Sequence, residues 1–221
     1  MDDHHPLIEL RDIVFGYDAE RVVLNNLALT WRAGERIGLT GSNGSGKTTL
    51  LHLMMGLIRP VAGEVRAFGR VCDTEEDFFT VRARIGLVFQ DPEDQLFCPT
   101  VAEDVAFGPF NLGWDRSDVE CAVRDTLARM GLRGFEDRVT HRLSFGEKRL
   151  VSLASVLAMR PRALLLDEPT SGLDHDVLER FVGVLDQLDL PLLVVSHDEG
   201  FLARVTTSRR HIENGCIAPI A

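Results

Sequence analysis

The sequence lacks long apolar runs, paired-cysteine motifs and an excess of positive charge. No window approaches the ~18 uncharged apolar residues that a helix needs to cross a bilayer. The N-terminus, MDDHHPLIEL, does not have the basic and then apolar profile of a signal peptide. We therefore expect a protein that stays inside the cell, does not insert into the membrane directly, and reaches a membrane only through a partner.

The cysteines and the charge each disfavour a class of function. Cys72, Cys98, Cys121 and Cys216 are widely spaced and form no C-x-x-C pair, which favours reduced, structural cysteines. The formal net charge is -10, whereas sequence-independent binding to nucleic acid needs a positive field. We expect no nucleic-acid partner.

The length and composition are sufficient for one full hydrophobic core. The chain has 221 residues, of which 45% are hydrophobic and 26% charged. These values fit one large domain, or one domain with an inserted lobe, and disfavour disorder. The sequence shows no internal repeat and no low-complexity linker.

Apolar patterns predict several strands in the N-terminal part of the chain. The predicted strands lie at residues 7–15, 22–31, 35–41 and 84–89. The run at 84–89 is continuous, as in a strand buried on both faces. Residues 47–58 predict a buried helix that ends at Arg59-Pro60, because helical dihedrals are disfavoured before proline.

Residues ~91–160 change to a helical pattern. Ser117 and Glu120 have the spacing of a capping box. The apolar residues expected on one face of the following helix are Val119, Ala122, Val123, Leu127 and Met130. We expect this region to form a helical lobe.

The C-terminal part returns to strands. Residues 162–169 and 191–198 predict two buried strands, separated by a helix over 176–188. Asn214-Gly215 predicts the turn of a terminal hairpin. Strands that alternate with helices indicate an α/β fold with a mainly parallel sheet, in which the helical lobe lies between strands.

A glycine-rich loop predicts a phosphate-binding site. It matches G-x-x-x-x-G-K-[ST] through Gly41, Ser42, Asn43, Gly44, Ser45, Gly46, Lys47 and Thr48. Glycines let backbone N–H groups surround a triphosphate, and the following helix adds partial positive charge. Lys47 would reach the β- and γ-phosphates, and the Thr48 hydroxyl would ligate Mg²⁺. A merely flexible glycine turn is disfavoured, because the loop lies between a predicted strand and a predicted helix.

Two carboxylates follow a buried strand in ALLLDEP. Asp167 and Glu168 stand at its C-terminal end, the edge at which open α/β sheets bind ligands. Asp167 can hold Mg²⁺, and Glu168 is placed to polarise the attacking water. Each acid alone also fits a strand-end turn or a helix cap. His197 follows the next strand, although a lone histidine is more often structural.

The order of the motifs resembles the nucleotide-binding subunit of ABC transporters over residues ~7–215. The elements are Tyr17, the phosphate loop, Gln90, LSFGE (143–147), Asp167-Glu168, SGLD (171–174) and His197. The resemblance implies a single domain over residues 1–221, with a P-loop NTPase core at about 7–90 and 161–221. It also implies an antiparallel β subdomain at the N-terminal side and an inserted helical (signature) subdomain at about 91–160.

The resemblance assigns roles to single residues, with ATP and Mg²⁺ as cofactors. Tyr17 would stack on adenine, and Ser42 to Thr49 would cradle the phosphates and Mg²⁺. Gln90 would touch the metal or the attacking water and relay the nucleotide state to a partner. Glu168 would be the general base and His197 the γ-phosphate sensor.

Further implied roles belong to a dimer, either a homodimer or a heterodimer with a related ATPase. Asp174 would report to the opposite site. In the family, a Leu-Ser-Gly-Gly-Gln type motif closes over ATP held by the other subunit. Ser144 and Gly146, which meet the γ-phosphate in the family, are kept, whereas Phe145 replaces a glycine and Glu147 replaces the glutamine. Read alone, Ser144 is a helix N-cap.

Other P-loop families fit less well. A small GTPase should show an N-K-x-D guanine reader, which is absent. A kinase built on a phosphate loop would not need LSFGE. ABC-type ATPases of DNA repair carry a long coiled coil in place of the compact lobe, and translation-factor members carry two such domains.

Residues 88–113 resemble the energy-coupling-factor group, and within it the ATPases of cobalt and nickel uptake. An acidic and aromatic surface of Asp91, Glu93, Asp94 and Phe97 could receive a basic coupling helix of integral membrane subunits, at the cytoplasmic face of the membrane. The alternative is a solvated charged loop with Phe97 in the core.

The cargo and the wider assembly stay open at this point. Longer relatives continue with a C-terminal helical extension, so a dimer of this chain is expected to rely on ATP, the core domain and the membrane subunit. Cobalt or nickel is the preferred cargo, ahead of biotin or another vitamin, although His4-His5 alone lack a ligand set. The alternatives are the ATPase of another ABC transporter and a soluble non-transport ABC ATPase.

Overall fold

The computed structural model describes residues 5–18 and 21–219, which fall into two compact units. The first unit comprises the described residues up to Arg82 and from Leu190 onward, and the second unit is Ala83–Asp189. These units divide the chain at residues 82/83 and 189/190, and so do not isolate the helical lobe. The lobe boundaries near 91 and 160 therefore stay a prediction.

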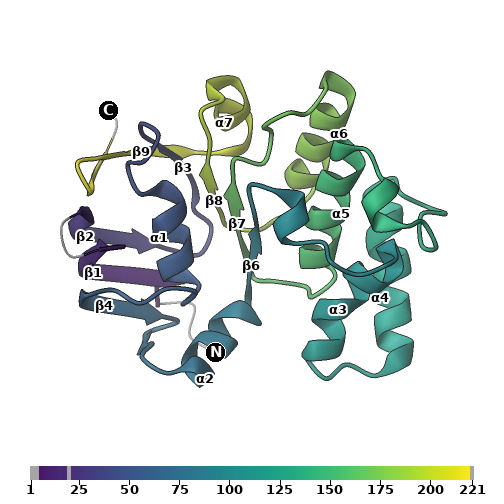
Figure 1. Ribbon diagram of the computed structural model, residues 1–221, viewed down its shortest axis with the longest axis horizontal. Helices are drawn as coiled ribbons and strands as arrows, with labels where there is room; N and C mark the ends of the chain where they lie inside the picture. The colour runs from purple at the N-terminus through teal and green to yellow at the C-terminus, as the bar shows by residue number, and fades with distance from the viewer. Residues whose placement is uncertain (1–4, 19–20, 220–221) are drawn as a thin grey trace. The chain divides into compact units, whose positions relative to one another are not determined.

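An antiparallel sheet in the first unit confirms the predicted β subdomain. Its strand order is β2-β1-β4-β5, and β1 pairs antiparallel with both β2 and β4. Figure 1 shows β1, β2 and β4 in the purple and blue part of the chain. The bounds are β1 Ile8–Gly16, β2 Val22–Trp31, β4 Ala62–Ala67 and β5 Arg70–Val71. Both longer predicted strands are therefore present, whereas β4 and β5 were not predicted.

The remaining strands of the first unit are mostly parallel. Strand β3 pairs in parallel with β8 on one side and β9 on the other, and β10 returns antiparallel to β9. The bounds are β3 Arg36–Thr40, β8 Leu192–Val195, β9 Ser208–Glu213 and β10 Cys216–Pro219. Asn214 and Gly215 have φ of 51° and 76°, as a two-residue hairpin turn requires, so the predicted hairpin is confirmed.

The helix after the phosphate loop is shorter than predicted. Helix α1 is Lys47–Met54, whereas the sequence predicts a helix to residue 58. Gly56 has φ of 67°, and a Cβ on it would lie 2.1 Å from Cγ of Phe78. A left-handed glycine thus ends the helix before Arg59-Pro60 does. Helices α2, Glu75–Arg82, and α7, Glu199–Val205, were not predicted.

The second unit combines two parallel strands with helices. Strands β6, Ile85–Val88, and β7, Ala163–Asp167, are buried throughout, which is why they read as continuous apolar runs. Figure 1 shows the teal helices α3 and α4 side by side, and α5 beside α6. The bounds are α3 Val101–Asn111, α4 Arg116–Arg129, α5 Phe145–Leu157 and α6 His175–Asp186, with 3₁₀ turns at Pro92–Asp94 and Thr140–Arg142.

The predicted cap at Ser117 is wrong. Helix α4 begins at Arg116 with Asp115 as N-cap, so Ser117 lies inside the first turn. A capping box needs its serine or threonine just before the helix, and two such boxes exist elsewhere, at Thr100–Glu103 and Ser144–Glu147. The apolar face of α4 is confirmed, since all five residues predicted for it are buried.

None of the helices found in residues 5–18 and 21–219 has the length and apolar content that a bilayer-spanning helix requires.

Candidate nucleotide site

The phosphate loop connects β3 to α1 within the first unit, as predicted. Gly46 occupies the N-cap position of α1 with φ of 102°, and a Cβ on it would lie 2.6 Å from Cδ2 of Leu24. A Cβ on Gly41 would lie 2.5 Å from the carbonyl oxygen of Ile212. A side chain at Gly41 or Gly46 would therefore collide with neighbouring atoms, because the loop backbone packs closely against them.

The N-terminus of α1 suits an anion. Within the described residues, no side chain caps this helix and its first turn carries no acidic residue. Lys47 is buried, and its Nζ donates to the carbonyl oxygens of Gly41 (2.8 Å) and Ser42 (3.0 Å). The ammonium group is thus held at the loop itself. Backbone N–H groups, a helix N-terminus and a fixed ammonium group fit a triphosphate.

Tyr17 lies beside this loop. Its hydroxyl is 3.0 Å from Oγ1 of Thr49, and its ring contacts Phe15 edge-on at 5.0 Å between centroids. The side chain is 67% exposed, so a ring face is accessible for stacking. The first unit therefore brings together two of the residues that the sequence predicts for nucleotide binding, Tyr17 and Thr49.

His197 follows β8 and is exposed, whereas Ser196 before it is fully buried. The next residue, Asp198, accepts a hydrogen bond from the N–H of Phe201 and caps α7. Its own N–H donates to Oγ of Ser196 at 3.1 Å. The chain on both sides of His197 is thus fixed by local hydrogen bonds.

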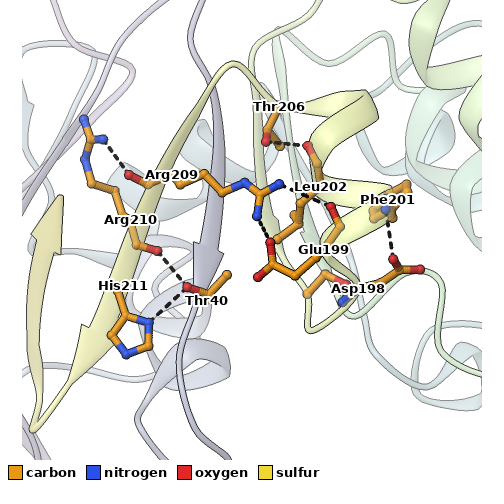
Figure 2. A network of polar contacts seen from close by, with 10 residues as sticks. Thr40, Asp198, Glu199, Phe201, Leu202, Thr206, Arg209, Arg210 and His211 are labelled. Atoms are coloured by element: carbon orange, nitrogen blue, oxygen red, sulfur yellow. Dashed lines mark hydrogen bonds and ion pairs between the residues drawn. The ribbon is translucent and has the colours of Figure 1, made fainter. Parts of the chain in front are cut away.

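A second set of contacts, not predicted from the sequence, holds the start of α7. Figure 2 shows Arg209 reaching from β9 to Glu199, where it forms an ion pair with the carboxylate and donates to the backbone carbonyl at 3.2 Å. In the same view, His211 contacts Thr40, with 3.0 Å between Nδ1 and Oγ1. Thr40 is the last residue before the phosphate loop. Strand β9 therefore supports two segments of the site, and no local motif marks it.

In the second unit, β7 ends at the two predicted carboxylates. Asp167 is buried, and Glu168 has a left-handed backbone with φ of 42°. Such a conformation in a residue other than glycine is strained and is frequent at functional sites. Hydroxyl and carboxylate oxygens, as in Thr48 and Asp167, are the donors that Mg²⁺ prefers.

No cluster of three or more His, Cys, Asp or Glu side chains suited to a metal occurs among the described residues. His4 lies outside those residues, and His5 belongs to no such cluster.

Ser144 begins α5 in a reciprocal cap with Glu147, which confirms the N-cap. The Glu147 N–H donates to Oγ of Ser144 at 3.2 Å, and the Ser144 N–H donates to the Glu147 carboxylate at 2.8 Å. Arg138 also donates to that carboxylate at 3.1 Å. A glutamate in place of the family's glutamine thus keeps the cap and adds an ion pair. Ser144 itself remains exposed.

Phe145 and Gly146 face the segment that leads into α6. A Cβ on Gly172 would lie 3.2 Å from Cε1 of Phe145, so the phenyl ring packs on that glycine. A Cβ on Gly146 would lie 2.9 Å from Cγ2 of Val177. Asp174 caps α6 by accepting the Val177 N–H at 2.9 Å. The LSFGE and SGLD segments are therefore in contact within the second unit.

Gln90 and the segment after it are partly anchored to α5. The side chain of Gln90 is exposed at the end of β6, while its carbonyl oxygen accepts a bond from Arg149. Glu93 pairs with Lys148 at 2.5 Å. Phe97 is 64% exposed and contacts Phe107 edge-on, so the alternative that Phe97 lies in the core is wrong.

A hollow of about 980 Å³ opens beside Phe107 in the second unit. Its lining comes mainly from α3 and α4 and includes Phe110, Val119 and Val123. Phe107 and Phe110 are both largely exposed. Cys98 also lines it, and burial together with the nearby Asp104 raises the pKa of the Cys98 thiol to about 11. This hollow is an apolar surface with charged residues at its edge.

The predicted site residues thus fall into two sets. The first unit holds the phosphate loop, Thr49, Tyr17 and His197; the second unit holds Gln90, Ser144, Gly146, Glu147, Asp167, Glu168 and Asp174. Their individual roles stay predictions.

Comparison with known proteins gives a consistent result. Residues 24–171 match the sequence family described as ABC transporter. The chain is 48% identical over 214 residues to a protein of Nitratidesulfovibrio vulgaris provisionally assigned as an ABC transporter ATP-binding protein, covering 96% of this chain and 78% of that one. It is 42% identical over 196 residues to the energy-coupling factor transporter ATP-binding protein EcfA of Methanothermobacter thermautotrophicus, covering 87% and 63%.

A solved structure is similar over nearly the whole chain. CbiO1 from Clostridium perfringens, described as part of the ABC transporter complex CbiONQ, has a TM-score of 0.85 and 29% sequence identity. The match covers 97% of this chain and 88% of that chain. The P-loop ATPase fold predicted from the sequence is therefore confirmed.

Proposed function

The chain belongs to the ABC transporter family as one of its ATP-binding proteins, and on that premise we propose that it drives an importer of the energy-coupling-factor type. The observation that carries the ATP-binding part of this proposal is the phosphate loop, with an uncapped helix N-terminus and the Lys47 ammonium group fixed at the loop. ATP hydrolysis is the activity of the family. The importer type rests on the likeness to EcfA and CbiO1.

We assign Mg²⁺-dependent chemistry to this chain's own residues. Lys47 and the loop N–H groups bind the β- and γ-phosphates, and Tyr17 stacks on the base. Thr48, Asp167 and Gln90 would supply oxygen ligands for Mg²⁺, which would neutralise phosphate charge when bound. Glu168 accepts a proton from the attacking water, and His197 contacts the γ-phosphate. A left-handed backbone in a residue other than glycine is frequent at functional sites, which supports this role for Glu168 at the end of β7.

A dimer is the proposed working unit, with Asp174 contributing to the opposite site. Ser144 is exposed at the N-terminus of α5, and Gly146 keeps that turn close to α6. A helix N-terminus attracts anions, whereas the chain already has a complete phosphate loop of its own. This supports a role for Ser144 and Gly146 at ATP held by a second subunit, either a copy of this chain or a related ATPase.

The test uses two single variants and their combination. Glu168→Gln should bind ATP, stop hydrolysing it and accumulate as a dimer, because the general base is lost but the contacts to ATP remain. Ser144→Arg should bind ATP with unchanged affinity and fail to hydrolyse it. The double variant should bind ATP and remain monomeric. Size-exclusion chromatography with light scattering, together with a phosphate-release assay, measures these outcomes.

Ser117→Arg is the matched control, because Ser117 is an exposed serine in the first turn of α4, away from LSFGE. It should dimerise and hydrolyse ATP like the unmodified chain. Hydrolysis at the normal rate in Glu168→Gln would remove the assignment of the base. A normal rate in Ser144→Arg would remove the assignment of the composite site.

The second unit offers a surface for an integral membrane partner. The hollow beside Phe107 and Phe110 is largely apolar, and Phe97 contacts Phe107 at its side. Its charged lining residues are three glutamates and two arginines: Glu103, Glu120, Glu136, Arg116 and Arg124. An apolar pocket whose lining carries more acidic than basic residues suits an amphipathic helix that has basic residues at its edge. We therefore propose that the chain acts at the cytoplasmic face of the membrane, bound through such a partner. Cobalt or nickel is the preferred cargo because residues 88–113 resemble ATPases of cobalt and nickel uptake.

Isolation from detergent-solubilised membranes tests the transport function against a soluble ABC ATPase. The tagged chain should copurify with a polytopic membrane protein, and Phe107→Glu should lose that protein. Phe79→Glu is the control, since Phe79 is equally exposed but lies on α2 of the first unit. Recovery of the chain without any membrane protein would favour the soluble alternative. The identity of the copurified subunit distinguishes metal from vitamin uptake.

A further inference from the structure

Arg149 is a buried arginine on α5, five residues after Ser144. Its relative exposure is 0%, and its guanidinium group donates to the carbonyl oxygens of Phe89 (2.7 Å) and Gln90 (2.5 Å). Its Nε has no hydrogen-bond partner among the described residues. The two bonds therefore connect the segment just after β6 to helix α5.

Gln95 holds the same residue, Phe89, through its backbone N–H group. Its Oε1 accepts the N–H of Phe89 at 3.1 Å. Its Nε2 donates to the carbonyl oxygen of Ser152 (2.7 Å) and to Oγ of Ser155 (3.0 Å), both on α5. Both backbone polar groups of Phe89 are thus connected to α5, one directly by Arg149 and one through Gln95.

The burial of this arginine is costly. Desolvation lowers the pKa of Arg149 to about 10, against the opposing effect of the carboxylates of Asp91 and Asp167. The guanidinium group remains charged at neutral pH, because 10 is well above 7. A buried charge that bonds to two neutral carbonyls is weak support for stability, since an apolar side chain of similar size would avoid the desolvation penalty. A role in positioning accounts for the charge better than packing does.

We propose that Arg149 and Gln95 are positioning residues that fix the peptide before Gln90 to α5, so that Gln90 and Ser144 move as one body. This rests on the proposed roles of Gln90 and Ser144 in ATP hydrolysis. Gln90 has an exposed side chain, so its aim depends on its own backbone, and Arg149 holds that backbone at the carbonyl. A displacement of about 1 Å at a reacting group can lower a rate about 100-fold.

The test is a double-mutant cycle in the full-length chain, with Gln90→Ala and Arg149→Met. Arg149→Met should lower kcat about 10- to 100-fold and leave the affinity for ATP within about twofold, because ATP binds first to the phosphate loop. Arg149→Lys should recover part of the rate, since lysine donates to carbonyls but lacks the two-pronged guanidinium. The variant with both changes should be no slower than Gln90→Ala alone.

The controls separate a positioning role from a structural one. The proposal would be overturned if Arg149→Met lowered kcat by the same factor in the Gln90→Ala variant as in the unmodified chain. If Arg149→Met does not fold, as judged by circular dichroism and thermal unfolding, Gln95→Glu replaces it in the cycle. Gln95→Glu keeps an acceptor for the Phe89 N–H but cannot donate to Ser152, and it should also slow hydrolysis non-additively with Gln90→Ala.

Failure of the proposed function gives a different result. If Gln90→Ala hydrolyses ATP at the unmodified rate, the role of Gln90 is wrong and the positioning role falls with it. If Gln90→Ala is slow but Arg149→Met and Gln95→Glu are both as fast as the unmodified chain, only the positioning role is wrong.

Discussion

Two helix N-termini in this protein belong to predicted phosphate contacts, and they are built differently. Helix α1 begins at Gly46 without a side-chain cap, whereas α5 begins at Ser144 with a reciprocal cap from Glu147. The backbone N–H groups in the first turn of α1 are therefore available to a ligand. In the first turn of α5, by contrast, the N–H of Glu147 already donates to the Ser144 side chain.

The two helix starts also differ in what holds them. Lys47 is bound to carbonyls five and six residues away, so the phosphate loop is organised by its own residues. Arg149 bonds to carbonyls 59 and 60 residues away in the sequence. On this comparison we expect α1 to contribute binding affinity for ATP, and α5 to contribute through its position, which distant segments set.

The largest expected effect comes from Lys47→Ala. Loss of the ammonium group removes charge-assisted hydrogen bonds to two phosphates, so the affinity for ATP should fall about 100- to 1,000-fold. Titration calorimetry with ATP and Mg²⁺ measures this. Lys148→Ala on α5 is the matched control, because Lys148 pairs with Glu93 and should leave the affinity within about twofold. Equal losses in both variants would break the distinction between a binding helix and a positioned helix.

A smaller effect is expected from Gly46→Ala, compared with Gly146→Ala. Gly46 has φ of 102° and a Cβ there would meet Leu24, so alanine should lower the free energy of unfolding by about 2–4 kcal/mol. Gly146 lies within α5, where alanine gains helix propensity while its Cβ presses on Val177. These terms offset, and the net change should stay within about 1 kcal/mol.

Thermal unfolding measures this pair, since 1 kcal/mol corresponds to about 2–4 °C for a chain of this size. Gly46→Ala should therefore unfold roughly 4–16 °C lower than the unmodified chain. If Gly146→Ala were the more destabilising change, the tighter backbone approach would lie at α5 and not at the phosphate loop.

The range over which contacts act also decides what could be predicted from the sequence. The loop between β3 and α1, the strand before it and the Asn214-Gly215 hairpin were predicted correctly as local structure, because each depends on a short run of residues. The helix end at Met54 was placed too late, because the left-handed Gly56 packs against Phe78, which is distant in the sequence. The cap was wrongly placed at Ser117 because the three-residue spacing of Ser117 and Glu120 also occurs inside helices.

The supports of the site were missed for the same reason. Arg209 and Arg149 act on segments that are separated from them in the sequence, and no local pattern marks either contact. The residues that would touch the nucleotide were predicted as motifs. The residues that aim them required the fold.

The smallest expected effect concerns Phe145, which stands where the family has glycine. The ring is 43% exposed and packs on Gly172, so Phe145→Gly loses that contact in addition to helix propensity. Phe79→Gly on α2 is the matched control, because Phe79 is a helical phenylalanine with 52% exposure. The packing on Gly172 should make Phe145→Gly the more destabilising change by about 1 kcal/mol, or about 2–4 °C in the unfolding midpoint.

ATP affinity and kcat of Phe145→Gly test whether the packing of Phe145 also affects function. Phe145→Gly should leave ATP affinity unchanged, because the phosphate loop lies in the other unit. Its effect on kcat should be absent in an Asp174→Ala background if Phe145 acts by holding the SGLD segment that contains Gly172. Equal unfolding midpoints for Phe145→Gly and Phe79→Gly would mean that the ring contributes nothing through Gly172. In that case α5 would be positioned by contacts to residues distant in the sequence, such as those of Arg149, without help from Phe145. The contrast with α1, whose first residue Lys47 bonds to the adjoining loop, would then be sharper.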